Sequence, residues 1–333
     1  MRVLVVGGGA IGTRHIKNIL SLGHEVTLVD PAVPTPEKWG MTPGNAVDWY
    51  ESLDHATKMG GYDAAVVASP SHLHYGHAKQ LLELGVPTFI EKPVATSYAL
   101  ARELDDIARE KGVLAMVGQS YRYHKGILLL KERLSPAMKG KVGYIGRPLM
   151  VNYFSGQHLS QWYPDGNYRD RYVSKREEGG GVLLTSATHL LDTIGFLFGC
   201  FYELSGVTTN SGTLGIDVAD AVVYSGRVGG DLTLFTASSD FLQRHNTHKI
   251  TVVGTEGECV LDLAYMGVGC SWTFTGKDTN EYIQLGNCGD RYLLEMYDFL
   301  EAVLNDEGGN VSPVPISESA SILYRIERYT EIV

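Results

Sequence analysis

Two side chains in this sequence of 333 residues combine reactive chemistry with unusual surroundings. Lys92 stands between an acid and a proline in the tripeptide EKP, at the end of a predicted buried strand, and His189 follows the triple glycine 179–181 on an apolar helical stretch. An imidazole has a pKa near neutrality, and the pKa of a lysine amine beside a cationic ring can be lowered toward it. Either group can therefore take the proton of an alcohol while a hydride leaves the carbon. This chemistry requires a hydride acceptor close by.

A glycine-rich turn near the amino terminus predicts a site for such an acceptor, a dinucleotide. An apolar run, Val3 to Val6, leads into the pattern G-x-G-x-x-G at Gly7, Gly9 and Gly12. The three glycines permit a tight turn, a close approach of the backbone to a pyrophosphate, and close packing of the following helix. The next predicted strand ends in Asp30, 18 residues after Gly12, where a carboxylate accepts hydrogen bonds from a ribose and repels a 2′-phosphate. We therefore expect NAD rather than NADP.

Alternating strands and helices fill the rest of the first 119 residues. Predicted strands end at Ser69, Glu91 and Gly118, and amphipathic helices lie between them. This alternation predicts an α/β fold with a doubly wound parallel sheet, whose ligands lie outside the carboxyl ends of the strands. Lys92 is therefore expected beside the nicotinamide. The histidines after the strand that ends at Ser69 are expected to be partly exposed, with His74 also a candidate for contacting the cofactor; they are His72, His74 and His77.

The second half of the chain has a different periodicity. Five segments alternate apolar and polar residues with period two: 146–156, 201–211, 221–240, 248–263 and 270–276. They predict an open, largely antiparallel sheet. The carboxyl-terminal segments 291–305 and 318–333 are predicted to be helical. We therefore expect a dinucleotide-binding Rossmann domain at residues 1–119, and a separate α+β domain at 120–333.

Four segments together resemble a known family: GGGAIG at 7–12, SPSHLHYGHAKQLLELG at 69–85, EKP at 91–93 and GGGVLLTSATHLLD at 179–192. The chain resembles the Gfo/Idh/MocA oxidoreductases, which include glucose-fructose oxidoreductase and inositol dehydrogenase, over nearly its whole length. The resemblance implies NAD(P)-dependent oxidation or reduction of a secondary alcohol of a sugar or polyol. It places the family's motif lysine on Lys92, its motif histidine on His189, and its turn proline on Pro93, which is expected to be cis.

The fingerprint and the resemblance together define the candidate cofactor-binding residues. They are Gly7, Gly9, Ala10, Ile11, Gly12, Asp30, Ser69, Pro70, His74, Glu91, Lys92 and Pro93. The resemblance also implies a homodimer or homotetramer that assembles through the carboxyl-terminal sheet.

Thr185, His189 and Asp192 share one face of the helix that follows the triple glycine. We expect His189 to project into the cleft between the domains as the principal acid/base, while Lys92 binds and polarises the reacting oxygen. The alternative is a core histidine that is hydrogen-bonded to Asp192, which is expected to be structural. The family commonly has an aspartate where this chain has Thr185, so either the substrate or the activity differs. This departure leaves open a catalytically silent, NAD-binding sugar sensor, and a glycosidase that uses NAD transiently is a third alternative.

A long segment with little regular pattern, residues 154–181, carries side chains suited to a sugar. Aromatic rings offer a surface to a sugar ring, and Gln and Arg supply donors for hydroxyl, carboxylate or phosphate groups. A similarity to the family branch associated with bacterial surface glycans favours an acidic or nucleotide-activated sugar. For Arg122 a surface salt bridge is the alternative to a role in binding. The candidate substrate-binding residues are Arg122, Gln157, Trp162, Tyr168, Arg169, Thr185 and His189.

Composition limits the partners and the location. The net charge of −10 argues against nucleic acid or an anionic membrane, which clustered Lys and Arg would hold. The apolar run at the amino terminus is too short for a signal peptide or a membrane span, so we expect a cytoplasmic protein. The four cysteines have neither paired nor zinc-like spacing. Reduced thiols and no metal are therefore expected.

Overall fold

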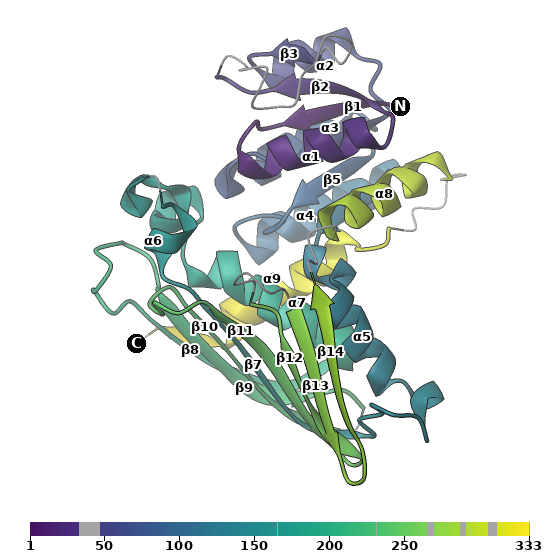
Figure 1. Ribbon diagram of the computed structural model, residues 1–333. Coiled ribbons are helices and arrows are strands. Elements are labelled where there is room, and N and C mark those ends of the chain that lie inside the picture. The colour runs from purple at the N-terminus through teal and green to yellow at the C-terminus, as the bar shows by residue number, and fades with distance from the viewer. Residues whose placement is uncertain are drawn as a thin grey trace. The chain divides into compact units, whose positions relative to one another are not determined.

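The computed structural model of the protein describes residues 1–32, 47–164, 166–230, 232–264, 270–286, 291–305 and 312–332. The chain forms two compact units, whose elements are labelled in Figure 1. The first unit comprises Met1–Ser120 and Tyr292–Tyr324, and the second comprises Tyr121–Arg291 and Arg325–Val333. The sequence had assigned all of 120–333 to one domain, so the return of 292–324 to the first unit is a correction.

The helix α8 (Arg291–Leu304) explains this return, because its apolar face packs on the first unit's sheet. Phe299 and Phe89 are both fully buried, and their rings meet edge to face with centroids 5.6 Å apart. Further along the chain, the Val117 N–H donates to the carbonyl of Val314 at 2.9 Å. Such an aromatic contact adds about 0.5–1.5 kcal/mol beyond the burial of the rings. Periodicity had predicted the helix itself but not the sheet on which it packs.

The first unit contains a six-stranded sheet in the order β3-β2-β1-β4-β5-β6. All of its strand pairs are parallel. The strands are β1 (Arg2–Val6), β2 (Glu25–Val29), β3 (Asp48–Tyr50), β4 (Ala64–Val67), β5 (Thr88–Glu91) and β6 (Ala115–Gly118). The helices α1 (Ala10–Ser21), α2 (Leu53–Met59), α3 (His74–Glu83) and α4 (Tyr98–Lys111) connect them. The predicted doubly wound parallel sheet is confirmed, and its strand order reverses between β1 and β4, where such sheets bind ligands.

The apolar run of β1 is continuous because the strand is covered on both faces. Its residues Val3 to Val6 are at most 2% exposed. A strand of a parallel sheet buries both faces in this way, so it does not alternate apolar and polar residues.

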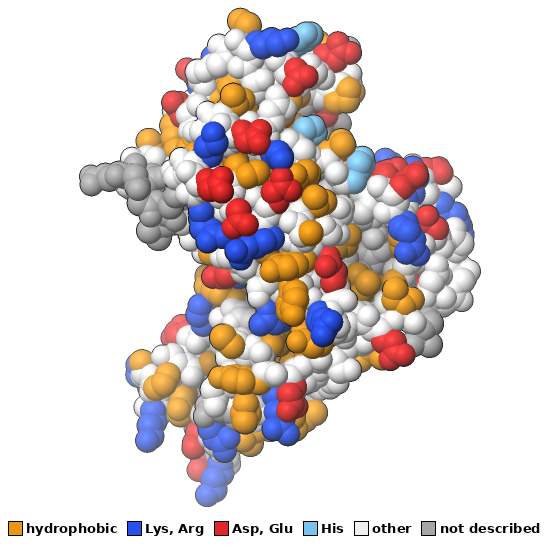
Figure 2. All heavy atoms as spheres, turned by 180° about the vertical axis from the view of Figure 1, so that it is seen from behind, with side chains coloured by type: hydrophobic (Ala, Val, Ile, Leu, Met, Phe, Trp, Pro, Cys, Tyr) orange, Lys and Arg blue, Asp and Glu red, His pale blue; other side chains and the backbone are white. Residues whose placement is uncertain are grey.

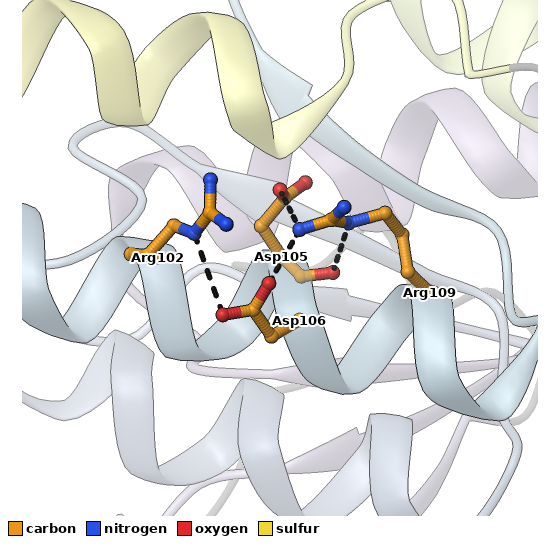
Figure 3. A network of polar contacts seen from close by, with 4 residues as sticks. All are labelled: Arg102, Asp105, Asp106 and Arg109. Carbon is orange, nitrogen blue, oxygen red and sulfur yellow. Dashed lines mark hydrogen bonds and ion pairs between the residues drawn. The ribbon is translucent and has the colours of Figure 1, made fainter.

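Four charged side chains on helix α4 of the first unit contact one another. On α4, Arg109 contacts both Asp105 and Asp106, and Arg102 contacts Asp106 from one helical turn away (Figure 3). The two pairs that Asp106 makes lie at the surface, and such helix pairs contribute about 0.3–0.5 kcal/mol each. On the face of the molecule drawn in Figure 2, acidic and basic side chains lie among one another without a continuous basic patch.

The second unit contains a nine-stranded sheet in the order β14-β13-β12-β11-β7-β10-β9-β8-β15. Two neighbouring pairs, β7 with β10 and β8 with β15, are parallel, and the others are antiparallel. The predicted open and largely antiparallel sheet is thus confirmed. The strands are β7 (Pro148–Gly156), β8 (Phe201–Thr209), β9 (Ala221–Val228), β10 (Thr233–Asp240), β11 (Thr247–Gly254), β12 (Gly257–Asp262), β13 (Cys270–Gly276), β14 (Asn280–Gly286) and β15 (Thr330–Ile332).

One face of this sheet forms the core of the second unit. Tyr153, Tyr224 and Trp272 point to that face and are at most 1% exposed. The helices α5 (Lys125–Leu134) and α7 (Thr188–Phe198) pack against β13 and against β9 and β10, respectively, and both lie on one side of the sheet in Figure 1.

Sequence periodicity missed three strands: β3 of the first sheet, and β14 and β15 of the second. The strand β14 follows the short turn after β13, and β15 replaces the end of the helix predicted for 318–333, because helix α9 (Ile316–Tyr329) stops at Tyr329. The Tyr224 hydroxyl contacts Thr330 at 2.8 Å, and β15 pairs with β8. Pairing with an edge strand therefore overrides the helical preference of these last residues.

The segment after the triple glycine is not one regular helix. A π-helical stretch, Leu183–Ala187, precedes α7. The span Arg176–Phe198 has the length and mean hydropathy of a membrane helix, but 56% of its most apolar window is buried inside the fold. Such burial is typical of a core helix.

Candidate functional site

The glycine turn has the geometry of a phosphate cradle. Gly7 has a φ of +103°, and a Cβ there would lie 2.6 Å from the carbonyl oxygen of Ala68, directly after β4. A Cβ on Gly12 would lie 1.8 Å from the carbonyl oxygen of Gly7. A Cβ on Gly9, by contrast, would meet no atom within 4 Å. The two outer glycines are therefore needed by the fold, and the middle one leaves space that a pyrophosphate can occupy.

The helix α1 begins directly after this space. Gly9 is its amino-terminal cap, Ala10 and Ile11 form its first turn, and no acidic residue stands in that turn. The N–H groups of this first turn and the positive end of the helix dipole can therefore receive an anion, and no carboxylate from the turn itself competes for them.

Asp30, at the end of β2, lies beside the same turn. One carboxylate oxygen accepts the Gly8 N–H at 2.6 Å, and the other accepts the Ala32 N–H at 2.8 Å. The Trp49 indole N–H donates to the Asp30 carbonyl at 2.9 Å. Each carboxylate oxygen can accept a second hydrogen bond, so the group is held in place and can still accept from a ribose.

The loop after β4 is tied to the loop after β5 by His74. Its Nδ1 lies 2.8 Å from the carbonyl oxygen of Pro93, and its Nε2 lies 2.7 Å from the carbonyl oxygen of Ser69. His74 is 2% exposed, which corrects the expectation of a partly exposed residue. His77 is half-buried with Nδ1 3.0 Å from the Ser69 hydroxyl, while His72 is exposed. Pro70 is exposed beside Ser69.

Lys92 stands at the carboxyl end of β5, where the Lys92–Pro93 peptide bond is cis, as expected. Burial lowers the pKa of the half-buried Lys92, and the neighbouring Glu91 carboxylate acts to raise it. Although burial acts to raise the pKa of Glu91, the hydrogen bond from His15 and its charge lower it. The His15 Nε2 lies 2.7 Å from the Glu91 carboxylate, and His15 is fully buried. His15 was not among the residues identified from the sequence.

His189 belongs to the second unit, on α7, and is half-buried there. The ring of Tyr121 meets the His189 imidazole edge to face, with centroids 4.9 Å apart. Asp192, one turn further, forms a two-pronged ion pair with Arg122 at 2.6 and 3.0 Å, and both side chains are nearly buried. Asp192 thus ties α7 to the segment Ser120–Tyr123. For Arg122, a surface salt bridge was the alternative to substrate binding. The structure shows a salt bridge, but in the interior rather than on the surface.

A second histidine, His248 on β11, contacts Tyr121, the same residue whose ring packs against His189. Its Nε2 lies 2.8 Å from the Tyr153 hydroxyl, and its Nδ1 lies 3.4 Å from the Tyr121 hydroxyl. Burial, with the nearby charges of His124 and Arg291, lowers the pKa of His248 to about 3. The sequence contained a signal for this residue. His248 lies two and four positions before the apolar residues Ile250 and Val252, and in a strand this spacing places all three on the same, buried face.

His124 and the cysteines complete the inventory of reactive groups. The His124 Nδ1 accepts the Gly126 N–H at the start of α5, and its Nε2 lies 3.3 Å from the Cys270 sulfur. Burial lowers the pKa of His124 to about 4 and raises the pKa of the Cys259 thiol to about 12. Cys200 is exposed, and Cys288 lies outside the described residues. Among the residues that are described, no group of three or more His, Cys, Asp or Glu could hold a metal ion.

The candidate substrate residues are used unequally by the fold. The Thr185 hydroxyl donates to the Gly181 carbonyl at 2.8 Å and is buried in the π-helical stretch. The Tyr168 hydroxyl donates to the Leu214 carbonyl at 3.1 Å, and Tyr168 is 8% exposed, so its ring is part of the core. Arg169 is exposed and stacks on the Tyr168 ring.

The fold uses the side chains of Trp162 and Gln157 less fully. Trp162 is half-buried against Phe241 at a centroid distance of 5.4 Å, and the backbone N–H of Gln157 donates to Asp240 at 3.2 Å. Trp162, Arg169 and Gln157 therefore remain candidates for substrate contact, whereas the hydroxyls of Tyr168 and Thr185 are occupied by the fold.

Replacing His248 by Gln should make the free energy of unfolding less dependent on pH. The folded protein keeps His248 neutral with a pKa of about 3, whereas the unfolded chain takes up a proton near 6.5. The unfolded state therefore binds more protons between these values, and stability falls as the pH drops below 6.5, by up to about 1.4 kcal/mol per pH unit for this one group. Denaturant titrations from about pH 7 to about pH 4.5 should show the shallower slope in His248→Gln. The exposed His72→Gln is the control, and equal slopes in all three proteins would contradict the assignment.

Comparison with known proteins agrees with both halves of this geometry. Residues 1–119 match the family described as "Oxidoreductase family, NAD-binding Rossmann fold", and residues 141–260 match "GFO/IDH/MocA C-terminal domain". The chain is 27% identical over 292 residues to levoglucosan dehydrogenase of Pseudarthrobacter phenanthrenivorans, which covers 74% of this chain and 72% of that protein. It is 25% identical over 267 residues to scyllo-inositol 2-dehydrogenase (NAD(+)) of Bacillus subtilis, covering 77% and 72% of the two chains.

Solved structures show the same fold. A levoglucosan dehydrogenase in complex with NADH and levoglucosan superimposes with a TM-score of 0.82 at 20% identity, covering 99% of this chain and 96% of that one. Across related proteins, the aligned part ranges from 36% to 77% of the relative's own length. The glycine cradle, the parallel sheet and the paired matches over both units place this chain in the Gfo/Idh/MocA family of oxidoreductases, with an NAD-binding Rossmann domain at its amino terminus.

Proposed function

We propose that this protein is a cytoplasmic, NAD-dependent dehydrogenase that exchanges a hydride with a secondary alcohol of a sugar or polyol. The observation that carries the proposal is Lys92, a half-buried lysine with a lowered pKa at the carboxyl end of β5 in an NAD-binding fold. A bound nicotinamide supplies the hydride acceptor or donor. A lysine with a lowered pKa is neutral in a larger fraction of molecules, so it can accept the hydroxyl proton of an alcohol.

The roles proposed for the two reactive groups follow from their surroundings. Lys92 binds and polarises the reacting oxygen, and its protonation is adjusted by burial against the Glu91 charge. His189 is the principal acid/base, and its ring is held by the edge of Tyr121. Lys92 belongs to the first unit and His189 to the second. Their meeting at one alcohol oxygen is part of the proposal.

The proposed substrate class comes from the relatives and from the free side chains. The relatives are named for levoglucosan and scyllo-inositol, an anhydrosugar and a polyol. Trp162 offers an aromatic face to a sugar ring, and the exposed guanidinium of Arg169 can pair with a carboxylate or phosphate. We therefore extend the substrate class to sugar acids and nucleotide sugars. The alternative of a catalytically silent sensor was based on Thr185 in the place of the family's aspartate. The Thr185 hydroxyl bonds to the backbone of the π-helical stretch, so this residue gives the sensor no further support.

Two glycine substitutions separate cofactor binding from folding. Gly9→Ala should leave stability unchanged, because its φ of −66° suits alanine and its Cβ meets nothing, yet NAD affinity should fall by at least about tenfold. Gly12→Ala should instead lower the free energy of unfolding by about 1–3 kcal/mol, because its Cβ meets the Gly7 carbonyl. Calorimetric titration with NAD and chemical denaturation measure the two effects. Unchanged NAD affinity in a folded Gly9→Ala would count against the cradle.

Lys92→Ala and His189→Ala should each lower kcat by about 10²–10⁴-fold while NAD affinity stays nearly intact, because each removes a group that acts on the reacting alcohol and leaves the glycine cradle for the pyrophosphate unaltered. The absorbance of reduced nicotinamide reports turnover with levoglucosan, scyllo-inositol, sugar acids and nucleotide sugars, in both directions. Lys79→Ala, which removes a half-buried lysine of α3 that is paired with Glu103, is the matched control and should be active. The proposal fails if the wild-type protein exchanges no hydride with any member of this panel.

We also propose that copies of the chain associate through the open face of the second sheet as a dimer or tetramer. Four apolar side chains on that face are 41–54% exposed, namely Met150, Val207, Val223 and Leu234. Met150 lies opposite Leu234, and Val207 lies opposite Val223, on paired strands. An apolar patch on a rigid sheet favours burial against a second copy. Leu234→Glu should therefore reduce the mass measured by light scattering, Leu84→Glu on the first unit should not, and a monomeric wild type would refute the association.

A further inference from the structure

The buried His74 has an environment that a neutral imidazole cannot satisfy. Its two ring nitrogens lie 2.8 and 2.7 Å from the backbone carbonyl oxygens of Pro93 and Ser69. Carbonyl oxygens only accept hydrogen bonds, and a neutral imidazole has a hydrogen on one nitrogen alone. In the neutral form one nitrogen lone pair would therefore face an oxygen lone pair at hydrogen-bonding distance, in a site that is 2% exposed to water.

The charges around this ring come from several elements. Glu91, at the end of β5, favours the protonated form, and its carboxylate is held by His15 from α1. Lys92 opposes it, as does His77 from the same helix α3 when charged. Burial is the largest influence and lowers the pKa of His74 below its ordinary value, although the two carbonyl hydrogen bonds act to raise it. The geometry argues for the charged form against this direction, because only a ring with two N–H groups satisfies both carbonyl oxygens. Burial acts on any enclosed imidazole, but a pair of acceptors in line with both ring nitrogens is specific to this one.

We propose that His74 is an imidazolium at neutral pH and that this buried cation clamps the loop after β4 to the loop after β5. One N–H holds the carbonyl of Ser69, and the other holds the carbonyl of Pro93, next to Lys92. Charge-assisted hydrogen bonds to backbone acceptors are stronger than neutral ones, so both loops are held in one arrangement. His74 is thus a positioning residue for the turn that carries Lys92.

The protonation state is tested directly on the wild-type protein. Nitrogen-15 NMR of histidine-labelled protein distinguishes a ring with two N–H groups from either neutral tautomer, and the signal missing in His74→Asn assigns the residue among the 11 histidines. His74→Gln serves for the assignment if the Asn variant does not fold. We expect both His74 nitrogens to carry hydrogen at neutral pH. One protonated and one unprotonated nitrogen at His74 would overturn the proposal.

The clamp is tested by backbone hydrogen exchange in the two loops. His74→Asn keeps at most one of the two bonds, so amides in residues 69–71 and 92–95 should exchange at least about tenfold faster than in the wild type. His72→Asn, a change on the neighbouring exposed face, should leave both loops unaltered. Exchange that is unchanged in either loop of His74→Asn would show that no clamp operates there.

The effect on Lys92 rests on the proposed function, whereas the two preceding measurements do not. In the hydride-transfer assay, His74→Asn should lower kcat by about tenfold with little change in the KM for NAD. It should also remove the part of the pH–rate profile that arises from loss of the His74 proton. An imidazolium with protected loops in a protein that transfers no hydride would refute the enzyme and leave the clamp established. A fully active His74→Asn with an unaltered pH profile would refute the positioning of Lys92.

Discussion

The charge of Glu91 is the constraint on which the first unit depends. This carboxylate ends β5 next to Lys92 and is 8% exposed, so it requires a partner inside the fold. His15 supplies that partner from α1, the helix whose amino terminus begins at the glycine cradle. Leaving such a charge without its partner costs about 3–5 kcal/mol. The helix that begins at the phosphate cradle and the turn that carries Lys92 are therefore joined by one buried contact.

The histidines of this chain show how surroundings assign different roles to one side chain. His15 faces a carboxylate, His74 faces two carbonyls, and His248 faces two tyrosine hydroxyls. A hydroxyl can donate or accept, so His248 is satisfied in its neutral form, in agreement with its pKa of about 3. His189, on a helix whose Asp192 is engaged by Arg122, is the histidine proposed for proton transfer.

The second unit combines a rigid core with a locally irregular site. Its sheet buries large aromatic side chains on one face, and α7 is anchored to the Ser120–Tyr123 turn by the Arg122–Asp192 ion pair. Between the triple glycine and α7, the chain is π-helical, with the Thr185 hydroxyl bonded to the Gly181 carbonyl. Insertions of this type are frequent near functional sites because they change the direction in which side chains project. Thr185 thus stands where the family commonly has an aspartate, and its side chain stabilises the π-helical stretch.

The sequence by itself determined the features that depend on neighbouring residues. The spacing of Gly7, Gly9 and Gly12, the βα alternation, the EKP tripeptide and the period-two strands each report a local backbone requirement, so they could be interpreted without coordinates. Only the tertiary structure decided the partners of the buried polar groups. His15 with Glu91, Arg122 with Asp192, and Tyr121 with His248 are separated by 76, 70 and 127 residues. The return of α8 to the first sheet and the pairing of β15 with β8 are decided in the same way. Such contacts form because a buried charge or apolar face takes whichever complementary group the folded chain brings near, and that choice leaves no periodic signal along the sequence.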